Sequence, residues 1–357
     1  MTPYYLAPDG MLDLVAFARL VLPDRRYWIE RQQLRQIRAG RDLVGRASTT
    51  GGHTDSSSLP SMVLGPGIPC RDDGLPTALV AFGDIDYGEF PDRASTWLGN
   101  RTARSLNEVE GSEVEAPLAN HGSAPLTNQL LRKTRDVFSP LPATGLEVEA
   151  VAAIYKERTN QPAVVYTGPD ASDYRLQHLP EPPRVLHLAT HGFFLEDKSQ
   201  QSAEHAERPM TLGGLALAGA NRGIKGETGP DGEDGILYAL EAQNLNLEGT
   251  ELVVLSACDT GKGEVDYSEG VYGLTRAFRT AGARNILMTL WPLNDALAAQ
   301  FMLDFYENWL SGASTSLGNH AAKTPADALH ETRLAWINSE DERKRNPRYW
   351  APYVLVE

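Results

Sequence analysis

The sequence predicts an α/β protein in which helices cover both faces of a mostly parallel sheet. From residue 77 onward, short apolar runs alternate with longer helical patterns, and most of the runs end in Gly or Asp. Short apolar runs bounded by turn residues are typical of buried parallel strands. The expected strands cover residues 77–84, 162–168, 184–192, 250–261, 284–291 and 348–357. The expected helices cover 171–179, 236–245, 269–283, 294–312 and 325–340, with one more beginning at Thr144.

Composition limits the possible functions. The chain has 357 residues, of which 41% are hydrophobic and 22% charged, so it can bury the core of one large domain or two smaller ones. The formal net charge of −14 repels phosphate backbones, so direct nucleic-acid binding is not expected. The same charge mildly favours basic peptides as partners, although an acidic surface can also be merely solvated.

Cysteine content and the N-terminal residues predict a compartment. Two cysteines, Cys70 and Cys258, cannot form a disulfide framework or a four-cysteine metal site. The first ten residues, MTPYYLAPDG, do not follow the pattern of a signal peptide, and no apolar run approaches 18 residues. We therefore expect a cytoplasmic protein without membrane contact, in a reducing environment where a reactive thiol persists.

The chain divides into two predicted regions. Residues 1–76 are expected to form short strands and turns, with a Ser/Gly/Pro-rich loop at 47–76. Residues 77–357 are expected to form the core, with a polar, loop-rich insert at 87–140. Thr144 followed by Glu147 predicts a capping box at the start of a helix, and the apolar stretch 212–220 predicts a hairpin.

Two reactive side chains occupy the carboxyl ends of predicted strands, where ligands gather in parallel sheets. His191 ends the strand 184–192, and Cys258 lies near the end of 250–261. A thiolate is the nucleophilic form of cysteine, and an imidazole can accept its proton and return one to a leaving amine. The backbone N–H groups of Gly192 and Cys258 are candidate donors to a developing oxyanion.

Taken singly, each of these residues has a structural interpretation. A cysteine that ends an apolar strand is usually a small buried residue, and a histidine at a strand end is more often structural than catalytic. The joint pattern carries more weight: a strand ending in His-Gly precedes a strand ending in Ala-Cys-x-x-Gly within one predicted sheet.

Longer strings around these residues resemble a known family. They include VLHLATHGFF, GLALAGAN, LSACDTGKGEV and EGVYGLTRAFRTAGARNILMTLWPLND, and the likeness runs from residue 5 to 356. The chain resembles the CHAT domains (caspase HetF associated with tetratricopeptide repeats), members of the caspase–separase–gingipain clan of cysteine peptidases. Family members commonly carry tetratricopeptide repeats or a sensor module before this domain, and neither is present in this sequence.

The resemblance implies a caspase-like fold and a cysteine endopeptidase with His191 and Cys258 as its catalytic dyad. It implies cleavage of protein substrates through a thioester acyl-enzyme, without a cofactor or a metal. A regulatory or sensor protein or subunit is the expected partner, and a bacterial signalling or defence pathway is the expected setting.

Acidic residues near the thiol motif suggest a substrate preference. Asp234, Asp259 and Asp266, together with Glu264, are candidates to line a pocket for a basic P1 side chain, although each is individually explained as a solvated loop carboxylate. A small or apolar P1 residue is the rival. The segment 222–235 is an activation loop, a self-cleavage site at Arg222 or Lys225, or an ordinary surface loop.

Two other functions remain open at this point. The chain can serve as a catalytically silent caspase-like scaffold or interaction module, although both dyad residues are present. A flavodoxin-like nucleotide binder also suits the predicted sheet, but no GxxxxGK[ST] or GxGxxG motif follows a strand.

Overall fold

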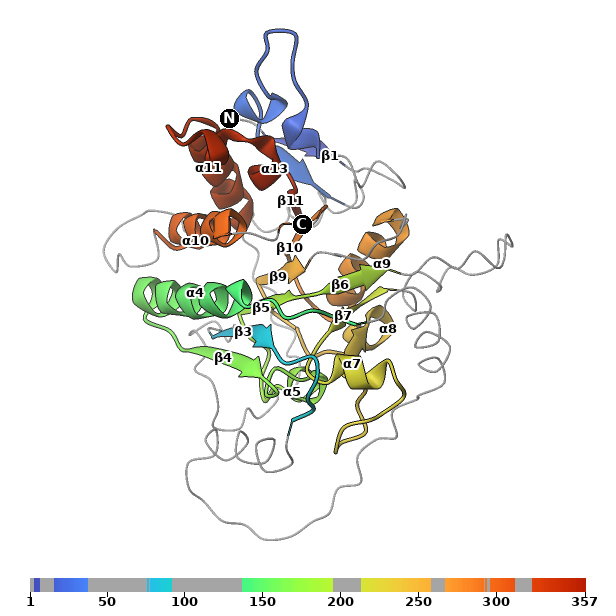
Figure 1. Cartoon of the computed structure of the whole chain (residues 1–357). Coiled ribbons are helices and arrows are strands. Elements are labelled where there is room, and N and C mark those ends of the chain that lie inside the picture. Colours follow the sequence, from blue (N-terminus) through green and yellow to red (C-terminus); the bar gives the residue numbers. More distant parts are fainter. Residues whose placement is uncertain are drawn as a thin grey trace, which may run out of the picture.

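The computed structural model describes residues 3–6, 16–37, 76, 78–91, 137–194, 213–257, 267–291, 293, 296–311 and 323–357. Within these ranges the chain folds around one eight-stranded sheet in the order β1-β2-β11-β10-β9-β5-β3-β4 (Figure 1). The strands are β1 (Tyr4–Leu6), β2 (Leu34–Gln36), β3 (Leu79–Ile85), β4 (Ala163–Gly168), β5 (Val185–Thr190), β9 (Leu252–Ala257), β10 (Ile286–Thr289) and β11 (Tyr353–Val356).

The sheet is mostly parallel, as the sequence predicts. β4, β3, β5, β9 and β10 run in one direction. β11 is antiparallel to β10, and β2 and β1 continue parallel to β11. The α/β class with a mostly parallel sheet is therefore confirmed.

Helices cover both faces of this sheet and bury two separate cores (Figure 1). Side chains alternate along each strand, so Leu186 and Leu188 enter one core, while Val185 and Ala189 enter the other. The first core is covered by α5 (Asp173–Gln177), α7 (Ala220–Gly223), α8 (Ala239–Ala242) and α9 (Tyr267–Thr280). The second is covered by α4 (Ala143–Thr159), α10 (Ala296–Leu310) and α11 (Pro325–Ile337).

The pairing of β5 with β9 is the longest continuous parallel register at the centre of the sheet. It runs from Val185 opposite Leu252 to Thr190 opposite Ala257. Because parallel neighbours end at the same edge of a sheet, Thr190 and Ala257 lie side by side at that edge.

The helix predicted from Thr144 begins one residue earlier, and the expected capping box is wrong. α4 starts at Ala143 after Pro142, and the Thr144 hydroxyl donates to the Leu141 carbonyl and accepts from the Asp84 backbone N–H at 2.8 Å. Glu147 is buried and points to the sheet instead, where its Oε1 lies 3.0 Å from His187 Nε2.

His187 is held from two helices on the second face. Its Nε2 contacts Glu147 of α4, and its Nδ1 lies 3.1 Å from the Tyr306 hydroxyl of α10. The ring itself is fully buried. Polar groups buried in this way need partners, so the three side chains fix how α4 and α10 sit on β5.

A small antiparallel sheet follows the main one, and it corrects three predictions. It consists of β6 (Gly192–Phe194), β7 (Gly213–Ala216) and β8 (Ile236–Tyr238) in the order β6-β7-β8. The strand expected over 184–192 is therefore divided, the stretch 212–220 forms β7 and the start of α7 rather than a hairpin, and 236–245 forms β8 and α8 rather than one helix. Long-range pairing overrides local propensity in all three.

The two ends of the described chain lie together. The 3₁₀ helices η2 (Phe17–Arg19) and η3 (Trp28–Glu30) precede β2, and α12 (Glu342–Arg345) and α13 (Pro347–Trp350) precede β11. The expected closing strand over 348–357 is thus a short helix followed by β11. Nearly all of the Ser/Gly/Pro-rich loop 47–76 lies outside the described residues.

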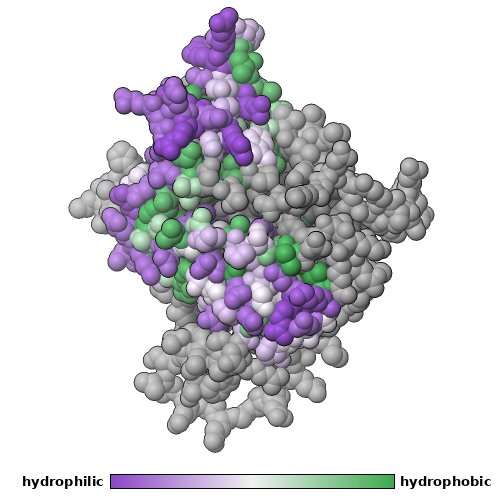
Figure 2. All heavy atoms as spheres, in the orientation of Figure 1, coloured by the Kyte–Doolittle hydropathy of each residue, from purple (hydrophilic) through white to green (hydrophobic). Residues whose placement is uncertain are grey.

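The visible surface is mainly hydrophilic around these terminal elements, with smaller hydrophobic areas between them (Figure 2). Within the described ranges, every helix is too short or too polar to cross a lipid bilayer.

We predict that Tyr306→Phe lowers the free energy of unfolding by about 1–3 kcal/mol, because it leaves a buried His187 nitrogen without its hydroxyl partner. Chemical denaturation of both proteins measures the change. Tyr5→Phe is the matched control, since Tyr5 is exposed on β1. Equal losses from the two variants would contradict a role for the buried hydroxyl.

Candidate active site

His191 directly follows β5, and it is buried in an aromatic setting. Only 1% of the residue is exposed, and its ring lies 5.2 Å from the Tyr87 ring and 5.6 Å from the Phe138 ring, measured between centroids. Thr190, the last residue of β5, helps to hold Tyr87 beside this ring. Its Oγ1 lies 3.1 Å from the Tyr87 hydroxyl and donates a hydrogen bond to the Ala216 carbonyl.

A backbone carbonyl sets the protonation of the imidazole. His191 Nε2 lies 2.7 Å from the Ser139 carbonyl oxygen. A carbonyl only accepts hydrogen bonds, so Nε2 carries the proton and the lone pair of the neutral ring lies on Nδ1. His191 is therefore oriented as a base that accepts a proton at Nδ1.

The segments that hold His191 come from the two ends of the predicted insert 87–140. The insert is predicted to be polar and loop-rich, and three aromatic residues at its two ends, Tyr87, Phe90 and Phe138, are buried. Residues 92–136 lie outside the described residues.

Asn221 in α7 ties these two segments together. Its Oδ1 accepts from the Phe138 N–H at 2.6 Å, its Nδ2 donates to the Phe138 carbonyl at 2.9 Å, and its backbone N–H donates to the Tyr87 carbonyl at 2.8 Å. This arrangement positions the adjacent Ser139 carbonyl. Sequence reasoning missed Ser139 and Asn221, although Asn221 closes the string GLALAGAN.

A glycine permits this close approach. Gly219 has a φ of +81°, and a Cβ atom there would lie 2.0 Å from the Phe90 ring. The Gly219 N–H also donates to the Asp86 carbonyl at 3.1 Å. Any larger residue would strain the backbone and collide with Phe90, which would displace the start of α7.

The strand that precedes the second residue of the predicted dyad, β9, lies beside β5. Ala257 ends β9 opposite Thr190, and Cys258 is the next residue in the sequence. Cys258 lies outside the described residues, as do Asp259, Glu264 and Asp266. The register thus pairs the two residues that immediately precede His191 and Cys258.

The Gly192 backbone has a direction that suits its predicted role. Gly192 pairs with Leu215 of β7, and the neighbouring Ala216 N–H donates to the His191 carbonyl at 2.9 Å. Antiparallel ladders alternate between bonded and non-bonded pairs, so the Gly192 N–H points away from β7.

Asp234 belongs to a group of acidic side chains around β8 and α8. Its Oδ1 accepts from the Ile236 N–H at 3.0 Å, and its charge acts on Asp173, Tyr238 and Glu241. Tyr238 links this group to the histidine through aromatic contacts. Its ring lies 6.2 Å from Phe193, which in turn lies 6.0 Å from Phe138.

Burial makes these carboxyl groups weaker acids. Burial, with a contribution from Asp234, raises the pKa of Glu241 to about 7. Burial and the nearby Glu241 hold the pKa of Asp173 well above its usual range, although Gln177 donates a hydrogen bond of 2.7 Å to it. Burial also raises the pKa of Glu233. A cation placed among these groups would favour their ionised forms.

The proposed cleavage sites Arg222 and Lys225 differ in their surroundings. Arg222 lies in α7, where its side chain pairs with Glu227 at 2.7 Å and covers the Phe90 ring at 5.0 Å. Lys225 follows the helix and is exposed. In the part of the chain that the structure describes, no group of three or more His, Cys, Asp or Glu residues could hold a metal ion.

Comparisons with known proteins give partial and complete matches. Tetratricopeptide repeat protein 28 of Mus musculus is 41% identical over 85 residues, and its Homo sapiens counterpart is 37% identical over 121 residues. These matches cover 23% and 34% of this chain, but only 3% and 4% of those proteins.

A structural likeness extends over most of the fold. The crystal structure of the Arg specific cysteine proteinase gingipain R (RGPB) superposes with a TM-score of 0.42 at 7% identity, covering 95% of this chain and 56% of that one. The model of the CHAT domain family matches residues 3–357. Because that match includes almost the entire sequence, the chain belongs to the CHAT domain family.

Proposed function

We propose that this chain is a cysteine endopeptidase that cleaves one or a few protein partners, with Cys258 as nucleophile and His191 as base. The observation that carries the proposal is the environment of His191. Its Nε2–H is held by the Ser139 carbonyl, and its strand pairs in register with the strand that leads to Cys258. Membership in the CHAT family supports the same chemistry.

In the proposed reaction, His191 Nδ1 takes the proton of the Cys258 thiol. The thiolate then attacks the carbonyl carbon of the scissile peptide bond, and the N–H groups of Gly192 and Cys258 stabilise the resulting oxyanion. Collapse breaks the C–N bond, and the leaving amine takes the proton from the imidazolium. Water activated by His191 then hydrolyses the thioester and regenerates the thiol.

The burial of His191 supports a regulated enzyme. A base with 1% of its surface exposed must be uncovered before a peptide can reach it. We propose that a regulatory or sensor protein, or a separate subunit, triggers that opening within a cytoplasmic bacterial signalling or defence pathway. The matched relatives carry tetratricopeptide repeats in their name, which fits a partner built from such repeats.

The same burial favours a second candidate function. A histidine that stays covered fits a catalytically silent scaffold, in which the fold serves only to bind partner proteins. The two functions differ in whether a partner protein is cleaved. The first experiment therefore measures cleavage.

We predict that a partner protein, co-expressed from the genomic neighbourhood, is cleaved by the wild type and left intact by Cys258→Ala. The reason is that the alanine removes the nucleophile and leaves the fold unchanged. Cys70→Ala is the matched control, because it removes the other thiol of the chain. Binding without cleavage by any variant would favour the scaffold, and cleavage by Cys258→Ala would exclude the proposed nucleophile.

We predict that Asn221→Ala lowers kcat by at least about 10-fold, because it releases the segment that places the Ser139 carbonyl against His191. A change in the ¹⁵N spectrum of the His191 ring, reporting a mixed tautomer, separates this positioning effect from simple destabilisation. Asn244→Ala is the control, since Asn244 is an exposed asparagine after α8. An unchanged ring spectrum together with unchanged kcat would contradict the assigned role.

We predict a preference for Arg or Lys at P1, supported by the buried acidic group around Asp234. The rings of Tyr238, Phe193 and Phe138 connect this group to His191. A fluorogenic peptide panel scanned at P1 measures this preference, and Asp234→Asn should reduce it. Asp231→Asn is the matched control in the same loop, because Asp231 is exposed. A preference for small or apolar P1 residues would refute the basic pocket.

A further inference from the structure

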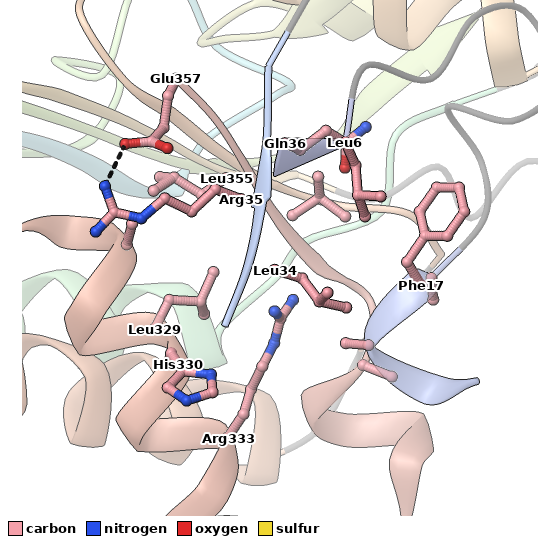
Figure 3. Close-up of a pocket in the computed structure, with 15 residues that line it drawn as sticks. Leu6, Phe17, Leu34, Arg35, Gln36, Leu329, His330, Arg333, Leu355 and Glu357 are labelled. Atoms are coloured by element: carbon pink, nitrogen blue, oxygen red, sulfur yellow. Dashed lines mark ion pairs between the residues drawn. The ribbon is translucent and has the colours of Figure 1, made fainter. Parts of the chain in front are cut away.

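A cavity of about 510 Å³, including space open to solvent, lies between the two ends of the described chain (Figure 3). It is bounded by β1, β2 and η2 on one side and by α11 and β11 on the other. Most of its lining is apolar and comes from Leu6, Phe17, Leu34, Leu329, Val354 and Leu355. Apolar walls with a few polar groups among them are the composition typical of small-molecule pockets.

Arg333 supplies a buried positive charge to this cavity. The residue is 6% exposed, and its guanidinium reaches from α11 toward Leu34 (Figure 3). Its Nε donates to the Trp350 carbonyl at 3.3 Å, and its Nη2 donates to the Tyr353 carbonyl. Among the described residues, Nη1 makes no hydrogen bond, and no carboxylate pairs with the guanidinium.

The carboxylates nearest this cavity already have a partner. Glu357 also lines the cavity, but it pairs with Arg35 at 3.6 Å, and Arg35 pairs with Asp327 at 2.8 Å. Both carboxylates are held by the single charge of Arg35, and among the described residues neither of them forms an ion pair with Arg333. Burial lowers the pKa of Arg333 to about 9, which still leaves the guanidinium charged at neutral pH. A buried cation without a counter-charge is costly and calls for an anion.

His330 lies beside Arg333 and has a ring nitrogen without a hydrogen-bond partner among the described residues. It is three residues earlier on α11, lines the same cavity, and its ring lies next to the Arg333 stem (Figure 3). Its Nδ1 is buried and makes no hydrogen bond to any described residue. Burial and the Arg333 charge lower the pKa of His330, so the neutral ring offers one N–H donor.

We propose that this cavity binds a small amphipathic anion, with a carboxylate or phosphate head group on Arg333 Nη1 and His330. The apolar side chains around it receive the body of the ligand. Arginine recognises both carboxylate and phosphate groups by charge-assisted hydrogen bonds. This site is separate from the strand ends that carry His191, and it does not depend on the proposed peptidase activity.

The test is isothermal titration calorimetry on the whole chain with hexanoate, hexyl phosphate and the uncharged hexan-1-ol. We expect saturable binding of at least one anion, at least 10-fold tighter than that of the alcohol. The tighter anion identifies the head group. The ¹⁵N signals of the His330 ring should shift during the same titration, which locates the ligand.

Three variants keep the outcome clear. Arg333→Gln should weaken anion binding by at least 10-fold, but it also removes the bonds to Trp350 and Tyr353 and can destabilise the fold. His330→Leu breaks no hydrogen bond with a described residue and should weaken binding several-fold in a protein with an unchanged melting temperature. Arg348→Gln is the control, since Arg348 is an exposed residue of α13.

Two results would overturn the proposal. One is the absence of saturable binding, or binding of hexan-1-ol as tight as that of the anions. The other is anion binding that persists unchanged in both Arg333→Gln and His330→Leu.

Discussion

The parallel pairing of β5 with β9 is the constraint on which the candidate site depends. Six consecutive residue pairs fix the register, and an offset of one residue would turn the side chains of one strand to the wrong face. The two cores enforce that register, because Leu186 and Val253 belong to one of them and Val185 and Val254 to the other. His191 and Cys258 are 67 positions apart in the sequence, and the residues that immediately precede them, Thr190 and Ala257, are thereby paired on neighbouring strands.

Two histidines four residues apart, His187 in β5 and His191 directly after it, illustrate how the surroundings of a side chain decide its chemistry. His187 has both ring nitrogens occupied by side chains, Glu147 and Tyr306, so its ring is held as a structural link. His191 has its Nε2 held by a backbone carbonyl, which leaves the lone pair on Nδ1. The difference arises because His187 lies against helices α4 and α10, whereas His191 lies against the segment at Ser139 that Asn221 of α7 holds in place.

Much of this arrangement could be predicted from the sequence, and there are physical reasons why the rest could not. The strands from residue 77 onward and the position of His191 at a strand end follow from local apolar runs and the glycines that end them. Ser139 acts through its carbonyl, which every residue possesses, so no side chain marks it. Asn221 acts through a contact between segments 83 positions apart, which no local pattern encodes.

Predictions failed where long-range contacts outweighed local preference. Thr144 and Glu147 have the spacing of a capping box, but burial of Glu147 against His187 decides its conformation. Residues 236–245 have helical character, yet Leu237 pairs with Leu215 and the helix starts only afterwards. The membership in the CHAT family was predictable because its strings are long and specific, unlike the bare His and Cys pair.

The reversed strand β11 has a consequence for how the chain can be joined to other proteins. β11 lies inside the sheet, between β10 and β2, and its last pairing is Val356 with Gln36. A polypeptide fused after Glu357 would therefore emerge from the middle of the molecule rather than from its rim. Tension on such a linker would act along the central strands, whereas a tether at β4 would pull on an outer strand alone.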